Sequence, residues 1–505
     1  MNRRCRFELF LMLALFMANC ARLSAEVDDS KAEEAIKALA GFIVRDEKIR
    51  GKPIVGVELG VGSLYDVMVK GVVPPDIRNA DLKCLRELKS LRTLRLTNAK
   101  ITGEGLKELS SLKNLQILGL TNTTITGACL KELSPLINLT ELDLGQTEID
   151  DASLTHLKGF PQLQTLDLRA TKINGTGLKE LQSLKNLRVL QLGGTFLTDQ
   201  GIRKLAALTN LTSLGFTVRE QMSNTALKDL RRLTNIEELR VGGKLTEEVL
   251  KELTALKKLK RLEISGADVS DEGLKELAAF PDLQELDPPR HMSNAGLKHL
   301  SRLKSLKSLN LRKTKVTDAG FNSLQELTKL QQLNLTQTEV GDQGLKHLRA
   351  LKTLERLSLT YTNISDTGLK ELRDLKSLRE LGLSLTQIGD TGLKELRDLQ
   401  NLCVLNLWGT KVTDEGLKEL RELKVLEELN LWDTQVSDKG IKELRDLPRL
   451  RKLNLKGTQI SDSALKELAG FKALQELNIS GTFVTDEGVE ALQKTLPLLK
   501  VVRNK

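Results

Sequence analysis

Residues 405–434 have the sequence LNLWGTKVTDEGLKELRELKVLEELNLWDT, which contains one complete repeat of the chain. The segment LNL alternates leucine with a polar residue, which is the period of a β-strand. The segment TDEGLKELRELKVL places leucines at steps of three and four residues, which is the period of a short helix. The LNL pattern then returns 24 residues after its first occurrence. Each repeat is therefore predicted to form one strand and one helix.

The same pattern recurs through most of the 505 residues, with seventeen copies spaced 24 residues apart and slips of one residue. The first leucine of each strand segment is Leu94, Leu118, Leu142, Leu166, Leu190, Leu214, Leu239, Leu262, Leu286, Leu309, Leu333, Leu357, Leu381, Leu405, Leu429, Leu453 or Leu477. One strand and one short helix cannot bury these leucines alone, so we expect successive repeats to stack on each other.

The unit TDxGLKELxxLxxLxxLxLxxT resembles a leucine-rich repeat, and the resemblance covers about residues 81–503. It is similar to the cysteine-containing repeats of F-box proteins, with threonine in place of their cysteine or asparagine, and to the arrays of exported, internalin-like bacterial proteins. The resemblance implies an α/β leucine-rich repeat solenoid. Strands lie about 4.8 Å apart and packed helices 8 to 10 Å, so the stack must bend. Parallel strands then line a concave face and short helices a convex face.

The N-terminus has the features of a secretory signal peptide. Arg3, Arg4 and Arg6 precede ten apolar residues, 9–18, and a cleavage site is expected after Ala25. The apolar run is too short to span a bilayer core of about 30 Å as a helix. We therefore expect a mature chain without a transmembrane segment, secreted or located in the periplasm or at the cell surface. Lipid anchoring through Cys20 is the less favoured alternative, because the preceding asparagine stands where a small residue is expected.

Caps are predicted at both ends of the array, which extends over residues 81–487 in about 17 units. Residues 26–80 are predicted to form an N-terminal cap, with a helical stripe from Ala35 to Ile43 that includes Ile36 and Leu39. In the same cap, residues 54–59 are expected to form a strand beside the first repeat. Residues 488–505 are predicted to form a C-terminal cap, in which Arg503 replaces the second strand leucine with a polar residue.

The units near residues 212–295 are irregular. The second strand leucine is replaced by Phe216 in one unit and by Pro288 in another, and both regions contain the triplet Met-Ser-Asn. Proline cannot donate a hydrogen bond to a neighbouring strand. Two interpretations stand side by side: a local kink between the halves of the array, and ordinary sequence drift.

Charge patterning argues against nucleic-acid binding. Removal of residues 1–25 leaves 73 basic and 66 acidic side chains, a net charge of +7. Lysine and glutamate alternate in the LKEL segments, so a continuous basic track for a phosphate backbone is not expected.

The reactive side chains do not form a catalytic pattern. His156, His299 and His347 occupy the glutamate position of LKEL, which we expect to face solvent, and they are not in adjacent repeats. Cys84 and Cys129 fall two repeats apart, too far for a disulfide or a shared metal ion. The sequence therefore predicts no enzyme activity, no cofactor and no metal site.

Two polar rows are interpreted as structural. A threonine follows each strand at Thr123, Thr147, Thr171, Thr195, Thr314, Thr338, Thr362, Thr386, Thr410, Thr434, Thr458 and Thr482. Its hydroxyl is expected to satisfy buried backbone amides where the chain turns. An aspartate opens each helix of the second half at Asp318, Asp342, Asp366, Asp390, Asp414, Asp438, Asp462 and Asp486. These carboxylates are expected to cap their own helices, and a calcium ladder is the less favoured alternative.

The two tryptophans of the chain are the strongest candidates for a binding site. Trp408 and Trp432 each follow an inward leucine, so both indoles are expected on the concave face, in contact on adjacent strands. The same column holds threonine, serine or lysine in other repeats, so packing does not require an aromatic there. Tyr361 is expected at the rim of this face, with Leu385 nearby, and such apolar clusters often mark contact sites. Mutual covering of the indoles over the leucines is the alternative.

Asn406 and Asn430 occupy the centres of the same two strands, within a row that continues at Asn310, Asn334, Asn454 and Asn478. Their side chains are expected to pair with each other along the stack, or else with a ligand. The overall prediction is a protein-protein interaction scaffold that binds its partner on the concave face. A polysaccharide or cell-envelope binding module is the first alternative. Substrate recognition for a ubiquitin ligase follows from the F-box resemblance alone, and a structural protein without a discrete ligand is the third.

Overall fold

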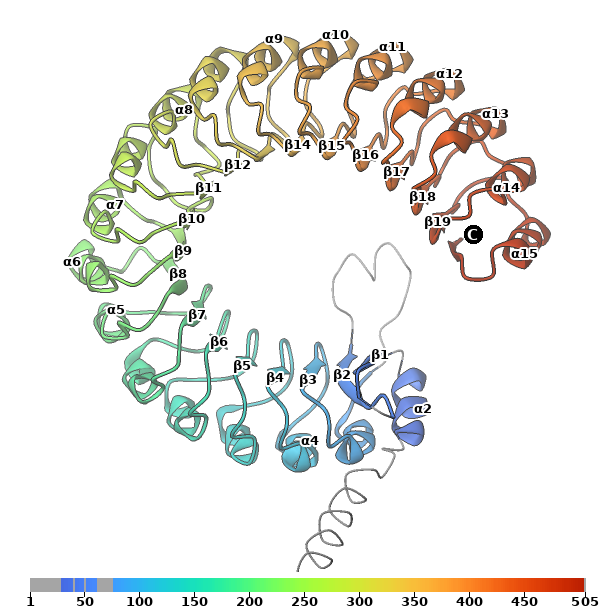
Figure 1. Ribbon diagram of the computed structural model, residues 1–505. Coiled ribbons are helices and arrows are strands. Elements are labelled where there is room, and N and C mark those ends of the chain that lie inside the picture. Colours follow the sequence, from blue (N-terminus) through green and yellow to red (C-terminus); the bar gives the residue numbers. More distant parts are fainter. Residues whose placement is uncertain (1–28, 40, 50, 61–75, 504–505) are drawn as a thin grey trace, which may run out of the picture. The chain divides into compact units, whose positions relative to one another are not determined.

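The computed structural model describes residues 29–39, 41–49, 51–60 and 76–503. The predicted signal peptide therefore lies outside the described residues. The chain divides into unit 1, which ends at Asn210, and unit 2, which begins at Leu211. Each unit is a stack of strand-and-helix repeats, which confirms the predicted solenoid fold, with strands on one side and helices on the other (Figure 1).

Unit 1 begins with elements that are not part of the repeat. The helix α2 (Ser30–Ala38) is followed by β1 (Phe42–Arg45), which pairs antiparallel with β2 (Ile54–Leu59). The strand predicted at residues 54–59 is confirmed, and it pairs parallel with the first strand of the array. Ile43 is not part of a helical stripe as predicted, because α2 ends at Ala38 and Ile43 belongs to β1.

The repeats of unit 1 pair in sequence order through parallel strands. Their strands are β3 (Thr93–Leu96), β4 (Ile117–Gly119), β5 (Glu141–Asp143), β6 (Thr165–Asp167) and β7 (Val189–Leu192). Most of their helices are 3-10 helices: η1 (Asn79–Glu87), η2 (Glu108–Ser111), η3 (Gly127–Leu133), η4 (Ala152–Gly159) and η5 (Thr176–Ser183), beside α4 (Gly103–Lys107) and α5 (Asp199–Leu205).

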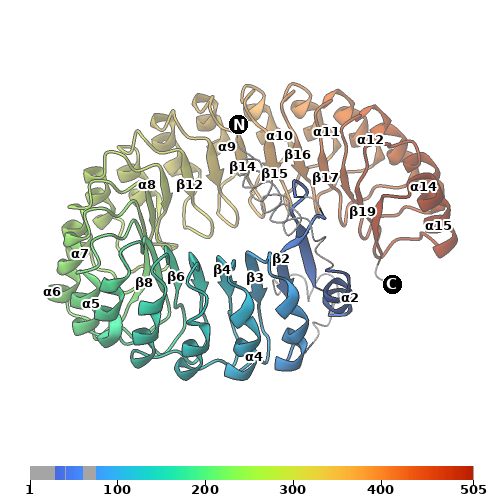
Figure 2. The ribbon, with the colours of Figure 1, turned by 60° about the horizontal axis from the view of Figure 1, so that its bottom comes forward.

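Unit 2 continues the pattern with thirteen parallel strands, again paired in sequence order. They are β8 (Ser213–Val218), β9 (Glu238–Gly243), β10 (Arg261–Glu263), β11 (Glu285–Asp287), β12 (Ser308–Asn310), β13 (Gln332–Asn334), β14 (Arg356–Ser358), β15 (Glu380–Gly382), β16 (Val404–Asn406), β17 (Glu428–Asn430), β18 (Lys452–Asn454), β19 (Glu476–Asn478) and β20 (Lys500–Val502). Within unit 2 the strand side is concave and the helix side convex (Figure 2).

The helices of unit 2 are short, and many pass from one α-helical turn into a 3-10 turn. The α-helices are α6 (Asn224–Lys228), α7 (Glu247–Leu253), α8 (Asn294–Leu300), α9 (Asp342–Leu345), α10 (Asp366–Leu369), α11 (Asp390–Leu393), α12 (Asp414–Leu417), α13 (Asp438–Ile441), α14 (Asp462–Leu468) and α15 (Asp486–Thr495). The 3-10 helices are η6 (Asp229–Arg232), η7 (Gly273–Ala279), η8 (Asp318–Glu326), η9 (Lys346–Ala350), η10 (Lys370–Leu372), η11 (Lys394–Leu396), η12 (Lys418–Glu422) and η13 (Lys442–Asp446).

The leucines of each repeat fill the space between the strand layer and the helix layer. In the repeat quoted above, Leu405, Leu407, Leu417 and Leu420 are fully buried. Because leucines 405 and 407 point inward, residues 406 and 408 between and after them must project from the opposite face. The sequence prediction of which side chains line the concave face follows directly from this alternation.

The threonine row is structural, as predicted, but its partner is a carbonyl rather than an amide. The Thr434 hydroxyl donates to the carbonyl of Leu431 at 2.6 Å, and Thr410 donates to Leu407 at the same distance. All twelve threonines of the row make this bond to the residue three positions earlier. Each hydroxyl therefore closes the tight turn that follows its strand.

The aspartate row does not cap its own helices, so that prediction is wrong. Each carboxylate from Asp318 to Asp462 accepts a hydrogen bond from the backbone N–H that precedes the helix of the next repeat. Asp390, for example, accepts from the Thr413 N–H at 2.8 Å and from its hydroxyl at 2.7 Å. Neighbouring repeats are close enough that a short side chain reaches the next helix as easily as its own. The row is thus a ladder that ties successive repeats together.

The ladder of aspartates explains why the motif TDxGLKEL contains a glycine. A Cβ at Gly416 would lie 2.3 Å from Oδ1 of Asp390, and Gly368 and Gly392 meet the preceding aspartate in the same way. A carboxylate that is already held by two donors cannot move aside without losing a bond. The repeat at Ala464 is an exception in which the extra carbon is accommodated.

The glutamate position of LKEL is half-buried or buried in most of these repeats, so the prediction that it faces solvent is wrong for His299 and His347, whereas His156 is exposed as predicted. The Glu371 side chain is only 13% exposed and pairs with Arg349 of the preceding repeat at 2.6 Å. Arg373, Arg397, Arg421 and Arg445 pair in the same way with Glu395, Glu419, Glu443 and Glu467. His347 occupies one such position and bonds Gln325 of the preceding repeat at 2.7 Å. These side chains form a second ladder, on the convex side.

In the irregular units near residues 212–295, the pairing between neighbouring strands differs from that in the rest of the array. Strands β8 and β9 pair over six residues, from Ser213 to Val218, where most neighbouring strands pair over three. Strands β11 and β12 pair over only two residues, Glu285 and Leu286. Pro288, directly after the end of β11 at Asp287, has no N–H to donate. The predicted kink stays a prediction.

Arg503 closes the C-terminal end of the array. It forms an ion pair with Asp486 and donates to the carbonyl of Val484 at 2.6 Å. Over the residues that the structure describes, no helix is both long enough and apolar enough to cross a membrane.

Candidate binding site

The two indoles lie in contact on adjacent repeats, as predicted. The ring centroids of Trp408 and Trp432 are 4.5 Å apart, and the ring planes are 11° from parallel. This separation matches the spacing of about 4.8 Å between neighbouring strands, so the two rings face each other along the direction of the stack. Both side chains are half-buried. Their edges, rather than their faces, are therefore turned toward the concave space.

A lysine covers the other face of the second indole. Nζ of Lys456 lies 4.3 Å from the ring centroid of Trp432, which is cation–π geometry. Lys456 occupies the same column of the next repeat, 24 residues after Trp432. Lys456 is visible in this column of the sequence, but there it indicated only that the position does not require an aromatic residue. Together the three side chains form a continuous stack, named here the indole stack.

Two large apolar residues extend the indole stack along the rim of the concave face. Tyr361 is 60% exposed and Leu385 is 39% exposed. Both have a backbone φ of 55°, in the left-handed region that bulky side chains rarely adopt. The left-handed backbone belongs to this position of the repeat, which elsewhere holds asparagine, glycine, glutamine, lysine, alanine or aspartate. At Tyr361 and Leu385 the position holds a large apolar residue instead.

Leu385 lies beside the indole stack. A Cβ built on Gly409 would lie 2.7 Å from Cδ2 of Leu385, so the leucine side chain extends over that glycine, next to Trp408. The N–H of Leu385 also donates to the carbonyl of Trp408 at 2.8 Å. The structure therefore brings Leu385, Trp408 and Trp432 together into one apolar surface, with Tyr361 one repeat further along the rim.

The asparagines of the row do not pair with each other along the stack, so the preferred prediction for them is wrong, although Asn310 donates to Asp287 of the preceding repeat at 2.9 Å. Oδ1 of Asn406 accepts from the backbone N–H of Trp408 at 3.2 Å, and Asn430 accepts from Trp432 at 3.0 Å. A side-chain acceptor two residues before an amide forms such a local turn more easily than a bridge between strands. Among the described residues, the side-chain nitrogens of Asn406 and Asn430 have no hydrogen-bond partner. They remain available as donors beside the indole stack.

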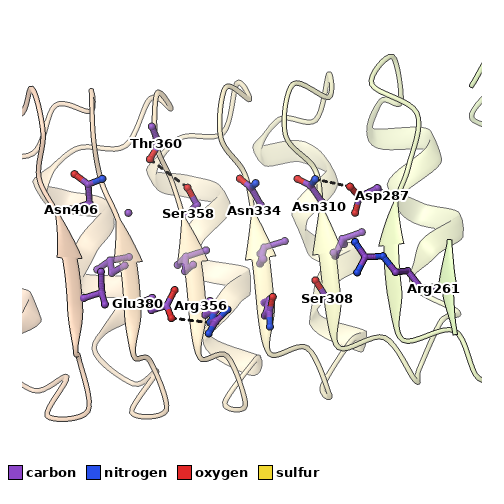
Figure 3. Close-up of a pocket in the computed structure, with 17 residues that line it drawn as sticks. Arg261, Asp287, Ser308, Asn310, Asn334, Arg356, Ser358, Thr360, Glu380 and Asn406 are labelled. Atoms are coloured by element: carbon purple, nitrogen blue, oxygen red, sulfur yellow. Dashed lines mark hydrogen bonds and ion pairs between the residues drawn. The ribbon is translucent and has the colours of Figure 1, made fainter. Parts of the chain in front are cut away.

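A shallow depression of about 470 Å³ lies on the concave face next to this surface. Figure 3 shows its side chains on neighbouring strands, from Arg261 and Asp287 at one end to Asn406 at the other. Seven of the seventeen lining residues are uncharged and polar, among them Ser308, Gln332, Asn334, Ser358 and Thr360, while four are charged and the other six are leucine, valine or glycine. The depression could not be located from the sequence, because apart from the asparagine row its residues are of types that recur along the strands.

Three of the four charged residues that line the depression form ion pairs, and the fourth, Asp287, accepts a hydrogen bond from the Asn310 amide at 2.9 Å. Arg356 pairs with Glu380 at 3.0 Å, and Arg261 pairs with Glu285 at 2.8 Å. Further along the same column Lys452 pairs with Glu428 at 2.6 Å, and this contact raises the pKa of the lysine. Exposed pairs of this kind contribute little to stability, but they leave this column without net charge.

The sequence predicts no metal site and no catalytic site. The histidines and cysteines on which that prediction depends do not belong to the concave surface described above. The structure brings together no group of three or more histidine, cysteine, aspartate or glutamate side chains suited to a metal ion in the described ranges. Cys84, Cys129 and Cys403 are free thiols. Burial raises the pKa of the Cys84 thiol, so its thiolate is disfavoured.

Two family models match the chain. The model described as "Leucine-rich repeat region" matches residues 101–297, and the model described as "Leucine Rich repeat" matches residues 87–110, 326–348, 350–372, 374–396, 448–469 and 473–492. The repeats are leucine-rich repeats. None of the curated proteins compared with the chain is similar to it.

Solved leucine-rich repeat structures share the fold. TLR13 in complex with ssRNA13 is 22% identical, with a TM-score of 0.53, and the match covers 80% of this chain and 65% of that chain. A leucine-rich repeat protein of Leptospira interrogans is 25% identical, with a TM-score of 0.41 and coverage of 87% and 98%. The internalin InlF of Listeria monocytogenes is 19% identical, with a TM-score of 0.35 and coverage of 80% and 95%. The likeness to TLR13 concerns the leucine-rich repeat fold alone.

Proposed function

We propose that this leucine-rich repeat protein is a non-enzymatic binding scaffold whose concave face in unit 2 holds a protein partner. The observation that carries the proposal is the stacking of Trp408 on Trp432 in a column where other repeats need no aromatic residue. Half-exposed tryptophans contribute strongly to protein interfaces, because they bury a large apolar area with little loss of side-chain freedom.

The neighbouring side chains support the same proposal. Tyr361 and Leu385 place bulky groups at left-handed positions, where an asparagine or glycine would cost less backbone strain. Both side chains are exposed, and exposed clusters of large apolar residues are typical of contact surfaces. Asn406 and Asn430 supply unpaired donors that a polar rim around such a contact would use.

A polysaccharide is the second candidate ligand. The depression of about 470 Å³ favours it, because hydroxyl and amide groups line it as they line many sugar sites. The indole stack argues against it. Sugar rings stack on indole faces, whereas the faces of Trp432 are covered by Trp408 and Lys456.

Site-specific photocrosslinking tests the proposal. A benzophenone amino acid is introduced at Thr360 on the concave face, with Lys370 on the helix side as the matched control position. The full chain is expressed in its source cells, and crosslinked proteins are identified by mass spectrometry. A protein crosslinked from residue 360, absent from residue 370 and lost in the Trp408→Ala/Trp432→Ala background, is the expected result. Crosslinks that persist without both tryptophans would contradict it.

The proposal includes export, with residues 1–25 as a signal peptide that is removed after Ala25. The mature protein would then act in the periplasm, at the cell surface or in the medium. Mass spectrometry of the protein purified from fractionated source cells tests this. An N-terminus at Glu26 outside the cytoplasm is expected, and a cytoplasmic protein that retains the basic segment would contradict it.

A further inference from the structure

The chemistry of the concave face in unit 2 suggests which kind of protein segment it holds. The column that contains Trp408 and Trp432 runs through Arg312, Thr336, Thr360 and Ser384 before the tryptophans, and through Lys456 and Ser480 after them. Neutral hydroxyls and indoles therefore occupy its middle, and a cation occupies each end of the segment from 312 to 456.

These two cations lack acidic partners. Among the described residues neither Arg312 nor Lys456 forms an ion pair, and the Lys456 ammonium lies over the ring of Trp432. The column on the other edge of the strands differs, because its cations at 261, 356 and 452 are paired with glutamates. Of the cations in these two columns of unit 2, only Arg312 and Lys456 lack a carboxylate partner among the described residues.

Hydrogen-bond donors also exceed acceptors near the indole stack. The side-chain nitrogens of Asn406 and Asn430 and the indole N–H groups have no partner within the described part of the chain, whereas the asparagine oxygens are used by backbone amides. Asp433, which extends toward Gly457, is the nearby carboxylate. A ligand rich in carbonyl and carboxylate oxygens matches this distribution.

The dimensions fit an extended chain. Six strand-to-strand intervals separate position 312 from position 456, which is about 29 Å at the usual strand spacing. An extended peptide covers about 3.3 Å per residue, so roughly nine residues reach from one cation to the other. The middle of that path passes the depression and the apolar surface of Leu385 and Trp408.

We propose that the concave face of unit 2 binds an extended acidic segment of its partner, running across strands β12 to β18. Carboxylates of the segment meet Arg312 and Lys456, and one apolar side chain packs on Leu385 and Trp408. Backbone carbonyls of the segment accept hydrogen bonds from Asn406 and Asn430. The inference rests on the proposed function, since it specifies the partner of the same surface.

A displayed library of random twelve-residue peptides, selected on the immobilised mature chain, tests this inference. The selected peptides are expected to be enriched in aspartate and glutamate and to carry a large apolar residue. The consensus peptide is then synthesised and titrated against the protein, with intrinsic tryptophan fluorescence as the readout. Because both tryptophans of the chain lie at the site, the signal reports only on this surface.

Charge reversal supplies the decisive comparison. Arg312→Glu/Lys456→Glu is expected to weaken the consensus peptide at least tenfold, whereas Lys370→Glu/Lys394→Glu on the helix side leaves its affinity unchanged. Circular dichroism confirms that each variant is folded. Selected peptides without acidic enrichment, equal affinity for the reversed variant, or failure to select any peptide would overturn the inference.

The outcomes separate the inference from the proposed function. Neutral or basic peptides that still require both tryptophans would refute the acidic segment and leave the binding surface standing. Peptides that bind equally well to Trp408→Ala/Trp432→Ala would refute the surface itself.

Discussion

The indole ring of Trp408 stacks on the indole ring of Trp432, with centroids 4.5 Å apart and planes 11° from parallel. Because the chain has only these two tryptophans, their electronic coupling can be observed without interference. We expect an exciton couplet in the circular dichroism spectrum of the mature chain. It should disappear in Trp408→Phe and in Trp432→Phe, while Phe483→Ala on the same unit should leave it unchanged. A couplet that survives either tryptophan replacement would contradict the stacked arrangement.

Tyr361→Asn separates stability from binding. Asparagine adopts the left-handed backbone at little cost and occupies this position at Asn98 and Asn122, so the free energy of unfolding is expected to rise by up to about 1 kcal/mol. The same change removes an exposed apolar contact, and partner affinity is expected to fall. Chemical denaturation and a binding titration on the same samples measure both effects. Unchanged affinity would mean that the tyrosine is not part of the contact surface.

The threonine row predicts a cost for losing one hydroxyl. Thr434→Val keeps the shape of the side chain but removes the 2.6 Å bond to the Leu431 carbonyl. We expect the free energy of unfolding to fall by about 1 kcal/mol. Thr434→Ser retains the hydroxyl and should recover most of the loss. Equal destabilisation by valine and serine would indicate that the methyl group, rather than the hydrogen bond, matters.

The aspartate ladder predicts a pH dependence at the C-terminal end of the array. The Thr485 backbone N–H and hydroxyl hold the pKa of the Asp462 carboxyl below its ordinary value. The stabilisation is therefore fully present above the unfolded-state pKa of about 3.9, and it is lost as the pH falls through the lower folded-state pKa. Asp462→Asn should destabilise the chain near neutral pH and differ progressively less from the wild type in acid.

Unfolding curves of both proteins at a series of pH values measure this difference. Asp433→Asn is the control, because Asp433 is exposed and lies outside the ladder, so its effect should be small at every pH. A difference between wild type and Asp462→Asn that grows in acid would have the wrong sign for a carboxylate with a lowered pKa.

The alternation of leucines made the repeat, the strands and the face of each strand residue predictable. Leu407 points inward, so the direction of Trp408 followed without any knowledge of its neighbours. The same argument placed Trp432 one strand away, within contact distance. These features depend only on period and on spacing, which the sequence contains directly.

Hydrogen-bond partners were harder to predict than directions. The sequence does not show whether Asp390 binds amides of its own helix or the Thr413 N–H of the next repeat, which is the partner it takes. Asn406 likewise chooses the amide two residues ahead over a neighbouring asparagine. Short polar side chains choose between partners by differences of an ångström or less, which only the folded backbone sets. Lys456 was visible in its column, but its position over the Trp432 ring was not.

The affinity of the crosslinked partner for Trp408→Ala/Trp432→Ala tests the central claim most directly. The control is Phe483→Ala, which removes an exposed aromatic of the same unit outside the indole stack. We expect the double tryptophan variant to bind at least tenfold more weakly than wild type while its unfolding curve stays nearly unchanged, because threonine, serine and lysine occupy the same column elsewhere. Wild-type affinity in the double variant would contradict the claim that this surface holds the partner.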